Sequence, residues 1–231
     1  MLELRKPDDT ARIVELLLKN VPGLGDFDAI DAAETAAYEA GAHALLHSPL
    51  PGRMDYGYLK KIHKALFGDL WPWAGKDRKD LGLQGGLRKN GMTVHFTASP
   101  DIKKEARRIF AQDSIEPLMC ATSAEKFVGG MAWLWNKLNA LHPFIDGNGR
   151  SARMFITELA RRSGIRFIAE NVPHQGIIEA SKEGMRGNLK PFAQFVMQEA
   201  ASVEENLAAF ERNKSLLRRG IFDPRPIALW R

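Results

Sequence analysis

The sequence predicts a mainly α-helical protein with one small β-hairpin, and two contrasting patterns carry this expectation. Over 123–141, and again from Arg150 onward, apolar residues recur every three or four positions, which is the spacing of a helix with one buried face. Between 77 and 100 the sequence holds four glycines and a short alternation of apolar and polar residues, which indicates strands. We therefore expect a helical bundle that carries a hairpin flap at about 77–100.

Helical spacing extends over most of the remaining chain. Turn-rich stretches such as 22–25 and 49–52 separate the helical segments. The pair His142–Pro143 should end one helix, because the residue before a proline is pushed out of the helical region. Gly164 is the expected stop of another. The expected helices are 11–20, 28–47, 54–67, 101–112, 123–141, 150–163, 175–184 and 189–207.

The hairpin is predicted from the residues that follow Asn90–Gly91, a pair that gives the strongest short signal for a turn between antiparallel strands. Apolar and polar residues alternate after this pair, so one face of the strand is apolar. The apolar set is Met92, Val94 and Phe96, and the polar set is Thr93, His95 and Thr97.

Length and composition favour one soluble domain with short appendages. The chain has 231 residues, 45% of them hydrophobic, and no run of 18 apolar residues that could span a membrane. Its single cysteine, Cys120, excludes an internal disulfide framework, and the polar N-terminus does not resemble a signal peptide. We expect a cytoplasmic protein with no membrane contact, made of an N-terminal arm (1–25), a central domain (26–205) and a basic C-terminal tail (206–231).

The formal net charge of +5 does not predict a nucleic-acid-binding protein. Residues 207–231 hold six basic and two acidic residues, hence +4, so the rest of the chain is close to +1. A basic tail is usually solvated or binds a partner, and the sequence shows no motif that reads bases. We therefore expect no nucleic-acid partner.

The segment 142–153, His-Pro-Phe-Ile-Asp-Gly-Asn-Gly-Arg-Ser-Ala-Arg, gathers the groups that an enzyme acting on a polyphosphate needs. Nucleotidyl and phosphoryl transfer depend mainly on positioning and charge neutralisation. The turn Gly147–Gly149 opens the expected helix, so its backbone N–H groups and the helix dipole form an anion site. Arg150 and Arg153 are three residues apart, share one helix face and can reach the same phosphate chain.

The same segment supplies a candidate base and a candidate metal ligand. Asp146 precedes the turn and can hold Mg²⁺ against the phosphates. His142, when neutral, can accept a proton from a hydroxyl nucleophile. A calcium loop is excluded, because its sixth position would be Ser151 instead of glycine and its twelfth Thr157 instead of glutamate. The chain also lacks the Gly-x-x-x-x-Gly-Lys-(Ser/Thr) motif of P-loop enzymes.

Segment 142–153 resembles the signature of Fic-domain proteins, His-Pro-Phe-x-(Asp/Glu)-Gly-Asn-Gly-Arg-x-x-Arg, and matches it at every fixed position. Residues 59–67, and 70–75 with Arg78 after them, resemble further landmarks of that family. The resemblance runs from about residue 26 to about residue 201. Fic proteins are mostly helical and usually transfer AMP from ATP to a hydroxyl of a target protein.

The resemblance implies a protein adenylyltransferase that uses ATP with Mg²⁺ and a protein target bearing a Ser, Thr or Tyr hydroxyl. An arginine at position 153 favours AMP transfer, since relatives that transfer other groups often depart from the signature there. The implied roles are His142 as catalytic base, Asp146 as Mg²⁺ ligand, Gly147, Asn148 and Gly149 as phosphate cradle, and Arg150 and Arg153 as contacts of the β- and γ-phosphates.

The resemblance also implies a docking surface and a form of regulation. The flap would pair with an extended target segment by main-chain hydrogen bonds at Thr93, Val94 and His95. Many Fic proteins are blocked by a (Ser/Thr)-x-x-x-Glu-(Gly/Asn) helix, in the same chain or in a separate small antitoxin. Residues 35–40 match in part, with Glu39 as the inhibitory carboxylate and Ala40 where glycine or asparagine is expected. Inhibition by a separate antitoxin, or none, fits the sequence better.

Two other functions stay open at this point. The same site could remove AMP from a protein, or transfer another nucleotide or a phosphate. A non-catalytic interaction module could keep the fold and the nucleotide pocket, although the intact His142 and Asp146 argue against it.

Overall fold

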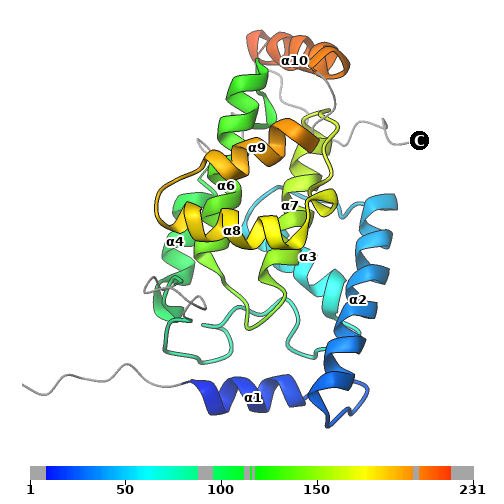
Figure 1. Cartoon of the computed structure of the whole chain (residues 1–231), viewed down its shortest axis with the longest axis vertical. Helices are drawn as coiled ribbons and strands as arrows, with labels where there is room; N and C mark the ends of the chain where they lie inside the picture. Colours follow the sequence, from blue (N-terminus) through cyan, green and yellow to red (C-terminus); the bar gives the residue numbers. More distant parts are fainter. Residues whose placement is uncertain (1–8, 88–95, 112–114, 116–117, 200–202, 220–231) are drawn as a thin grey trace, which may run out of the picture. The chain divides into compact units, whose positions relative to one another are not determined.

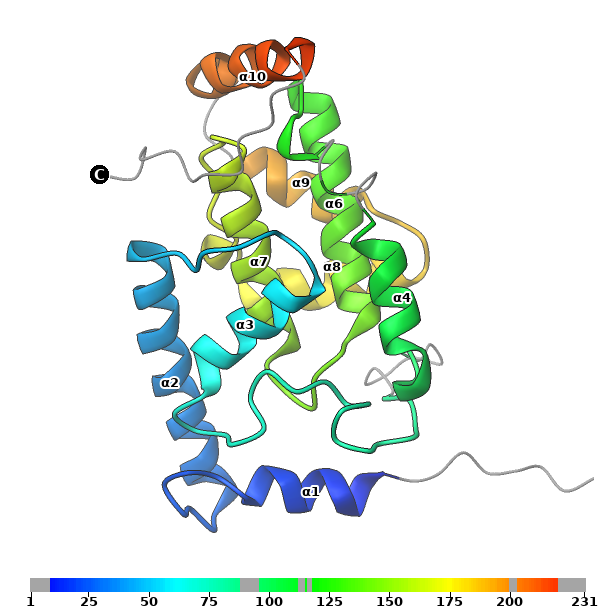
Figure 2. The same cartoon turned by 180° about the vertical axis from the view of Figure 1, so that it is seen from behind.

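The computed structural model describes residues 9–87, 96–111, 115, 118–199 and 203–219, and these residues are mainly helical (Figures 1 and 2). Two short 3₁₀ helices, Ser99–Asp101 and Ala169–Asn171, lie between the longer helices. The α-helices are α1 (Thr10–Leu18), α2 (Phe27–His47), α3 (Tyr56–Phe67), α4 (Ile102–Ile109), α6 (Ala124–Leu141), α7 (Asn148–Arg162), α8 (His174–Met185), α9 (Lys190–Glu199) and α10 (Val203–Arg218).

The predicted hairpin falls largely on residues outside the described part of the chain. The Asn90–Gly91 turn and the docking residues Thr93, Val94 and His95 all belong to 88–95. The residues on either side of this segment are joined, because the N–H of Phe96 donates to the carbonyl of Leu87 at 2.9 Å. The residues that the structure does describe contain no strand, so the helical class is confirmed and the hairpin stays a prediction.

The chain divides into two compact units. The first comprises residues 1–107 and 141–151, and the second comprises 108–140 and 152–231. The segment 142–150, which carries most of the expected site, lies wholly within the first unit.

In the first unit, α2 and α3 pack against each other at close range (Figure 2). A Cβ atom on Gly41 of α2 would lie 2.8 Å from the carbonyl oxygen of Ala65 and from the Cα of Leu66, so only glycine permits this approach. Each helix starts at an aspartate whose side chain accepts a backbone N–H of the first turn, Asp26 for α2 and Asp55 for α3. Packing therefore holds α2 against α3, and capping fixes where each helix begins.

The second unit has its own core of large apolar side chains. The ring of Trp135 on α6 packs against Phe167 and Phe192, with centroids 6.2 and 5.2 Å apart, and Phe127 packs against Phe210 of α10.

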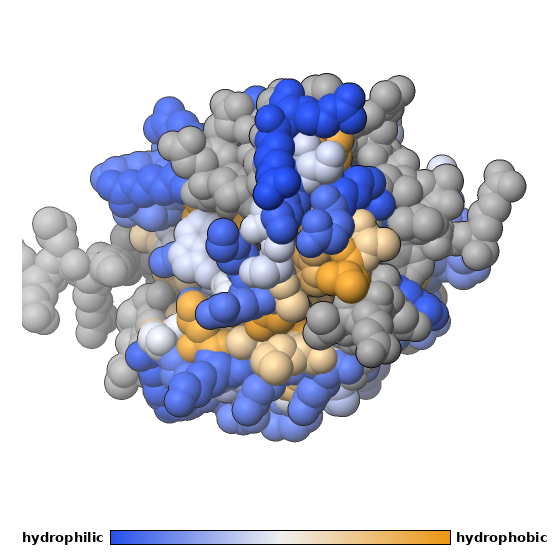
Figure 3. Space-filling model, turned by 90° about the horizontal axis from the view of Figure 1, so that it is seen from above, coloured by the Kyte–Doolittle hydropathy of each residue, from blue (hydrophilic) through white to orange (hydrophobic). Residues whose placement is uncertain are grey.

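At the surface, the face drawn in Figure 3 shows mainly hydrophilic residues, with hydrophobic ones in smaller areas between them. None of the helices in the described ranges combines the length and apolar character that crossing a bilayer requires.

The sequence interpretation was wrong about the last helices. One helix was expected over 189–207, but α9 ends at Glu199 and a separate helix, α10, runs from Val203 to Arg218. The expected start of the basic tail at residue 206 therefore lies inside α10. The buried positions of this helix follow helical spacing, but two of them are asparagines and Leu207 is exposed, so the apolar pattern in the sequence is weak. The buried residues are Asn206, Ala209, Phe210 and Asn213.

Candidate active site

The loop that precedes α7 is closed by the side chain of Asn148. Its amide oxygen accepts the N–H of Phe144 at 2.8 Å, and its amide nitrogen donates to the carbonyl of Phe144 at 3.0 Å. Phe144 itself is fully buried. The Asn148 side chain thus holds the loop, and its backbone N–H remains the group expected to contact a phosphate.

Gly147 is required by the backbone and by its surroundings. Its φ of 71° lies in the left-handed region, and a Cβ atom would overlap the buried ring of Phe67, with Cζ at 2.9 Å. Gly149, by contrast, would meet nothing within 4 Å. Helix α7 begins at Asn148, two residues earlier than expected. Its first N–H groups have no carbonyl partner within the helix, so they offer an anion site at the end of the loop.

His142 follows directly on the end of α6, as expected from the proline after it. Its φ of 44° is left-handed, which is strained for a residue with a side chain. Its ring stacks on Phe96, with the centroids 3.6 Å apart and the planes 11° from parallel. The Arg78 side chain donates to the His142 carbonyl through Nε at 3.0 Å and through Nη2 at 2.8 Å.

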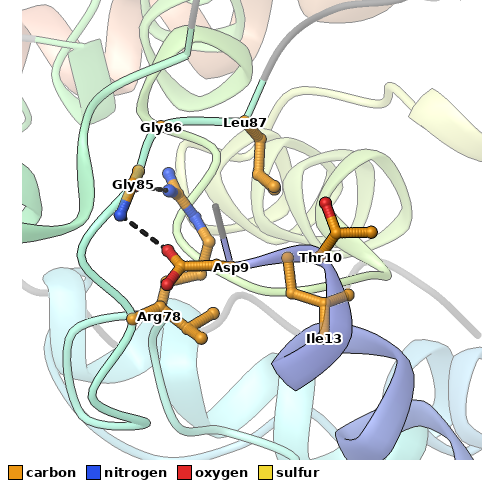
Figure 4. A pocket seen from close by; sticks show the side chains of 8 residues that line it. Asp9, Thr10, Ile13, Arg78, Gly85, Gly86 and Leu87 are labelled. Carbon is orange, nitrogen blue, oxygen red and sulfur yellow. Dashed lines mark hydrogen bonds between the residues drawn. The ribbon is translucent and has the colours of Figure 1, made fainter. Parts of the chain in front are cut away.

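Arg78 connects His142 to both sides of the segment 88–95. Besides the His142 carbonyl, its guanidinium donates to the carbonyls of Gly85 and Thr97 and to the hydroxyl of Ser99. The side chain is 1% exposed, and burial lowers the pKa of Arg78 to about 10, so it stays charged at neutral pH. Beside it lies a pocket lined by residues from 9–13 and 78–87, where Asp9 accepts the N–H of Gly85 at 2.6 Å (Figure 4).

His63 on α3 holds the middle of the loop, and the sequence interpretation did not assign it a role in the site. Its Nδ1 accepts the N–H of Gly75 at 2.9 Å, so its Nε2 carries the proton and donates to the Asp146 carbonyl at 3.1 Å. The ring also stacks on Phe144. Burial lowers the pKa of His63 to about 4, which keeps it neutral. The sequence feature that could have indicated His63 is its position among the regularly spaced apolar residues of α3, which are buried.

Asp146 presents one carboxylate next to the start of α7. Its Oδ1 accepts the N–H of Gly147 at 2.6 Å, and about half of its side chain is exposed. Burial of the loop raises the pKa of Asp146, and the negative charge of Asp31 raises it further. Mg²⁺ in nucleotide sites is commonly held by one or two carboxylates together with substrate phosphates, so this single carboxylate fits a magnesium ion that arrives with a triphosphate.

Arg150, in the first turn of α7, is surrounded by groups from α2, α3 and the loop. Its Nη2 forms an ion pair with Glu34 of α2 and lies 3.5 Å from Oδ1 of Asp146. Its guanidinium carbon also lies over the rings of Tyr38 and Phe67, 5.6 and 4.9 Å from their centroids. The contact with Glu34 was not expected from the sequence.

The other expected residues lie elsewhere on these helices. Arg153 is one turn farther along α7 and belongs to the second unit. Glu39 is exposed on α2. Glu34, five residues earlier and so on a different side of the same helix, is buried. An inhibitory role for Glu39 stays a prediction.

Comparisons with known proteins point to one family. The model of the Fic/DOC family matches residues 53–160. Protein adenylyltransferase VbhT of Bartonella schoenbuchensis is 32% identical over 198 residues, which are 86% of this chain and 38% of VbhT. The probable protein adenylyltransferase y4lH of Sinorhizobium fredii is 27% identical over 179 residues, which are 77% of this chain and 88% of that protein.

A solved structure gives the same result at the level of the fold. The crystal structure of BepC from Bartonella tribocorum, which contains bound AMPPNP, superposes with a TM-score of 0.72 at 25% identity and covers 79% of this chain and 91% of that one. The family match includes the loop and the start of α7 described above, together with α3 and Arg78. Residues 53–160 of the chain therefore form a domain of the Fic/DOC family.

Proposed function

We propose that the chain is a protein adenylyltransferase, which transfers AMP from MgATP to a Ser, Thr or Tyr hydroxyl of a target protein. The observation that carries the proposal is the loop 142–150, which presents a histidine at one end and a helix N-terminus with Asp146 and Arg150 at the other. The names of the relatives VbhT and y4lH, and the AMPPNP bound to BepC, support the same activity.

In the proposed reaction His142 accepts the proton of the target hydroxyl. The hydroxyl oxygen then forms a bond to the α-phosphorus of ATP, and the bond between that phosphorus and the bridging oxygen of the leaving pyrophosphate breaks. Asp146 would hold Mg²⁺, which neutralises charge on the triphosphate. Stacking on Phe96 and the hydrogen bonds from Arg78 to its carbonyl hold His142 in one orientation before substrates arrive.

The start of α7 and Arg150 would receive the phosphates. The first backbone N–H groups of α7 favour negative charge, and Arg150 keeps part of its side chain, 22%, accessible. Arg153 follows on the same helix and is the residue that we assign to the γ-phosphate. An arginine fork suits the oxygens of a phosphate better than a point charge does.

The target protein would dock on the segment that contains Thr93, Val94 and His95. The hydrogen bond between Phe96 and Leu87 closes this segment at its base, and Phe96 also stacks on His142. A target strand paired with the segment would therefore lie next to His142, the proposed catalytic base.

A small antitoxin that carries the inhibitory helix is the regulatory partner that we propose. Inhibition within the chain by Glu39 is the alternative, and the variant Glu39→Gly tests it.

The group that is transferred can be identified with labelled ATP. Purified protein is incubated with cell lysate and Mg²⁺, and with ATP labelled on either the α- or the γ-phosphate. We expect protein bands labelled from the α-label alone, together with release of pyrophosphate. Label transferred from the γ-position would instead identify a phosphotransferase. Nucleotide binding without any transfer would identify an interaction module.

A further inference from the structure

Glu34 is a buried carboxylate in a helix that is otherwise rich in alanine. It is 6% exposed and lies on the side of α2 that faces α3. It precedes Tyr38 by one turn and Gly41, where α3 leaves no room for a Cβ atom, by two turns. It forms an ion pair with Arg150, which lies 116 residues later in the chain. A buried ionised group is stable only when it is paired, so this ion pair is part of the structure of the first unit.

Arg150 is thereby held from three directions. Glu34 pairs with its Nη2, the rings of Tyr38 and Phe67 lie beside its guanidinium, and Asp146 lies 3.5 Å away on the loop. Tyr38 and Glu34 are four residues apart on α2, so a single helix supplies both the charge partner and one of the rings. A long, flexible arginine side chain is in this way limited to few orientations at the start of α7.

The Glu34 contact could either compete with phosphate for Arg150 or leave Arg150 able to bind phosphate at the same time. If Glu34 competed with phosphate for Arg150, nucleotide binding would have to leave a buried carboxylate without its cation, which is strongly unfavourable. A guanidinium has five N–H donors in a planar fork, and one carboxylate engages at most two of them. The same guanidinium can therefore pair with Glu34 on one edge and bind a phosphate oxygen on another.

We infer that Glu34, assisted by Tyr38, is a positioning residue that keeps Arg150 oriented for the triphosphate and stays paired with it in the nucleotide complex. The inference rests on the proposed function, since it takes Arg150 as a phosphate contact. It concerns the ion pair across α2 and α7, and it assigns Glu34 a supporting role in nucleotide binding instead of an inhibitory one.

The test is the affinity for MgATP, measured calorimetrically without a target protein for the wild type, Glu34→Gln, Glu34→Ala and Arg150→Ala. Glu34→Gln keeps the shape and a hydrogen bond but removes the charge. We expect affinity to fall by about tenfold in Glu34→Gln and further in Glu34→Ala, because charged hydrogen bonds contribute more than neutral ones. Adding Glu34→Gln to Arg150→Ala should cause no further loss, since the residues act through one contact.

Asp28→Asn is the matched control, because Asp28 is an exposed carboxylate on the same helix, and its affinity for MgATP should equal that of the wild type. A melting curve of Glu34→Gln close to that of the wild type shows that any loss of affinity is not a loss of folding. Tighter ATP binding or faster transfer in Glu34→Ala would overturn the inference and identify Glu34 as an inhibitor.

Failure of the inference can be told apart from failure of the proposed function. Unchanged affinity in Glu34→Gln, with weakened affinity in Arg150→Ala, would reject the positioning role alone. Unchanged affinity in Arg150→Ala would reject Arg150 as a phosphate contact, and with it both the inference and this part of the proposed function.

Discussion

At one end of the loop 142–150, which we call the base end, His142 is held by hydrogen bonds from Arg78 to a neutral carbonyl and by the stacked ring of Phe96. At the other, the phosphate end, Asp146 and Arg150 are held by ion pairs and by rings beside the guanidinium. Hydrogen bonds to a carbonyl fix direction, whereas contacts between charges tolerate movement. The base end is thus built for orientation and the phosphate end for charge.

The two ends also depend on different parts of the first unit. Arg78 links the base end to Gly85 and Thr97, which flank the expected docking segment, while Glu34 and Tyr38 link the phosphate end to α2. Between them, His63 and Phe67 of α3 support the middle of the loop. Changes at the base end should therefore affect the rate of transfer, and changes at the phosphate end should affect nucleotide affinity.

Gly147→Ala should have the largest effect, because it disturbs the shared middle of the loop and hence both ends. The new Cβ would meet the buried Phe67 ring, and the left-handed φ disfavours alanine. We expect a loss of unfolding free energy of about 2–4 kcal/mol, measured by urea denaturation. Gly149→Ala is the control, since it meets no atom within 4 Å. Equal stability of the two variants would show that the loop does not need Gly147.

Arg78→Met should act on the base end. The variant keeps much of the side-chain volume but leaves the carbonyls of His142 and Thr97 without these donors. We expect kcat to fall by about a hundredfold, while the affinity for MgATP changes little, because His142 loses its orientation. Steady-state kinetics and calorimetry separate the two quantities. An equal loss in both would mean that Arg78 supports the whole loop and not one end.

Asp146→Ala should act on the phosphate end. Removal of its carboxylate should raise the Mg²⁺ concentration needed for half-maximal ATP binding by at least about tenfold, the lower limit for residues that merely support a metal ligand. Titration of Mg²⁺ at fixed ATP measures this shift. An unchanged Mg²⁺ requirement would remove Asp146 from the metal site.

The sequence could predict the roles of residues in 142–153, because these residues are contiguous and their types and spacing indicate a polyphosphate site. It could not predict the ion pair of Glu34 or the hydrogen bond from His63 to the loop, since these join residues 116 and 83 positions apart. Nor did it predict the role of the Asn148 side chain, whose amide groups bind the backbone of Phe144. Helical spacing predicted most helices but joined α9 to the start of α10 in one expected helix, because buried asparagines in α10 weaken its apolar pattern.

Acid should weaken the support of the loop, by an amount that is small near neutral pH and grows as the pH falls. The folded pKa of His63 is lowered to about 4 from an ordinary value of 6.5, so the unfolded chain binds the proton more readily. The contribution of His63 to stability is present in full above pH 6.5 and is lost progressively as the pH falls toward 4, by about 3 kcal/mol in all. Denaturation of the wild type and His63→Gln across this range measures it. Parallel pH profiles for the two proteins would contradict the assignment.

The most direct test of the central claim compares His142→Ala with the wild type in two assays, transfer of α-labelled AMP to protein and binding of MgATP. Because His142 belongs to the base end, we predict that transfer falls by at least about a hundredfold while ATP affinity and the melting temperature stay close to those of the wild type. Transfer near the wild-type rate in His142→Ala would contradict the role of His142 as the base and, with it, the division of the loop into a base end and a phosphate end.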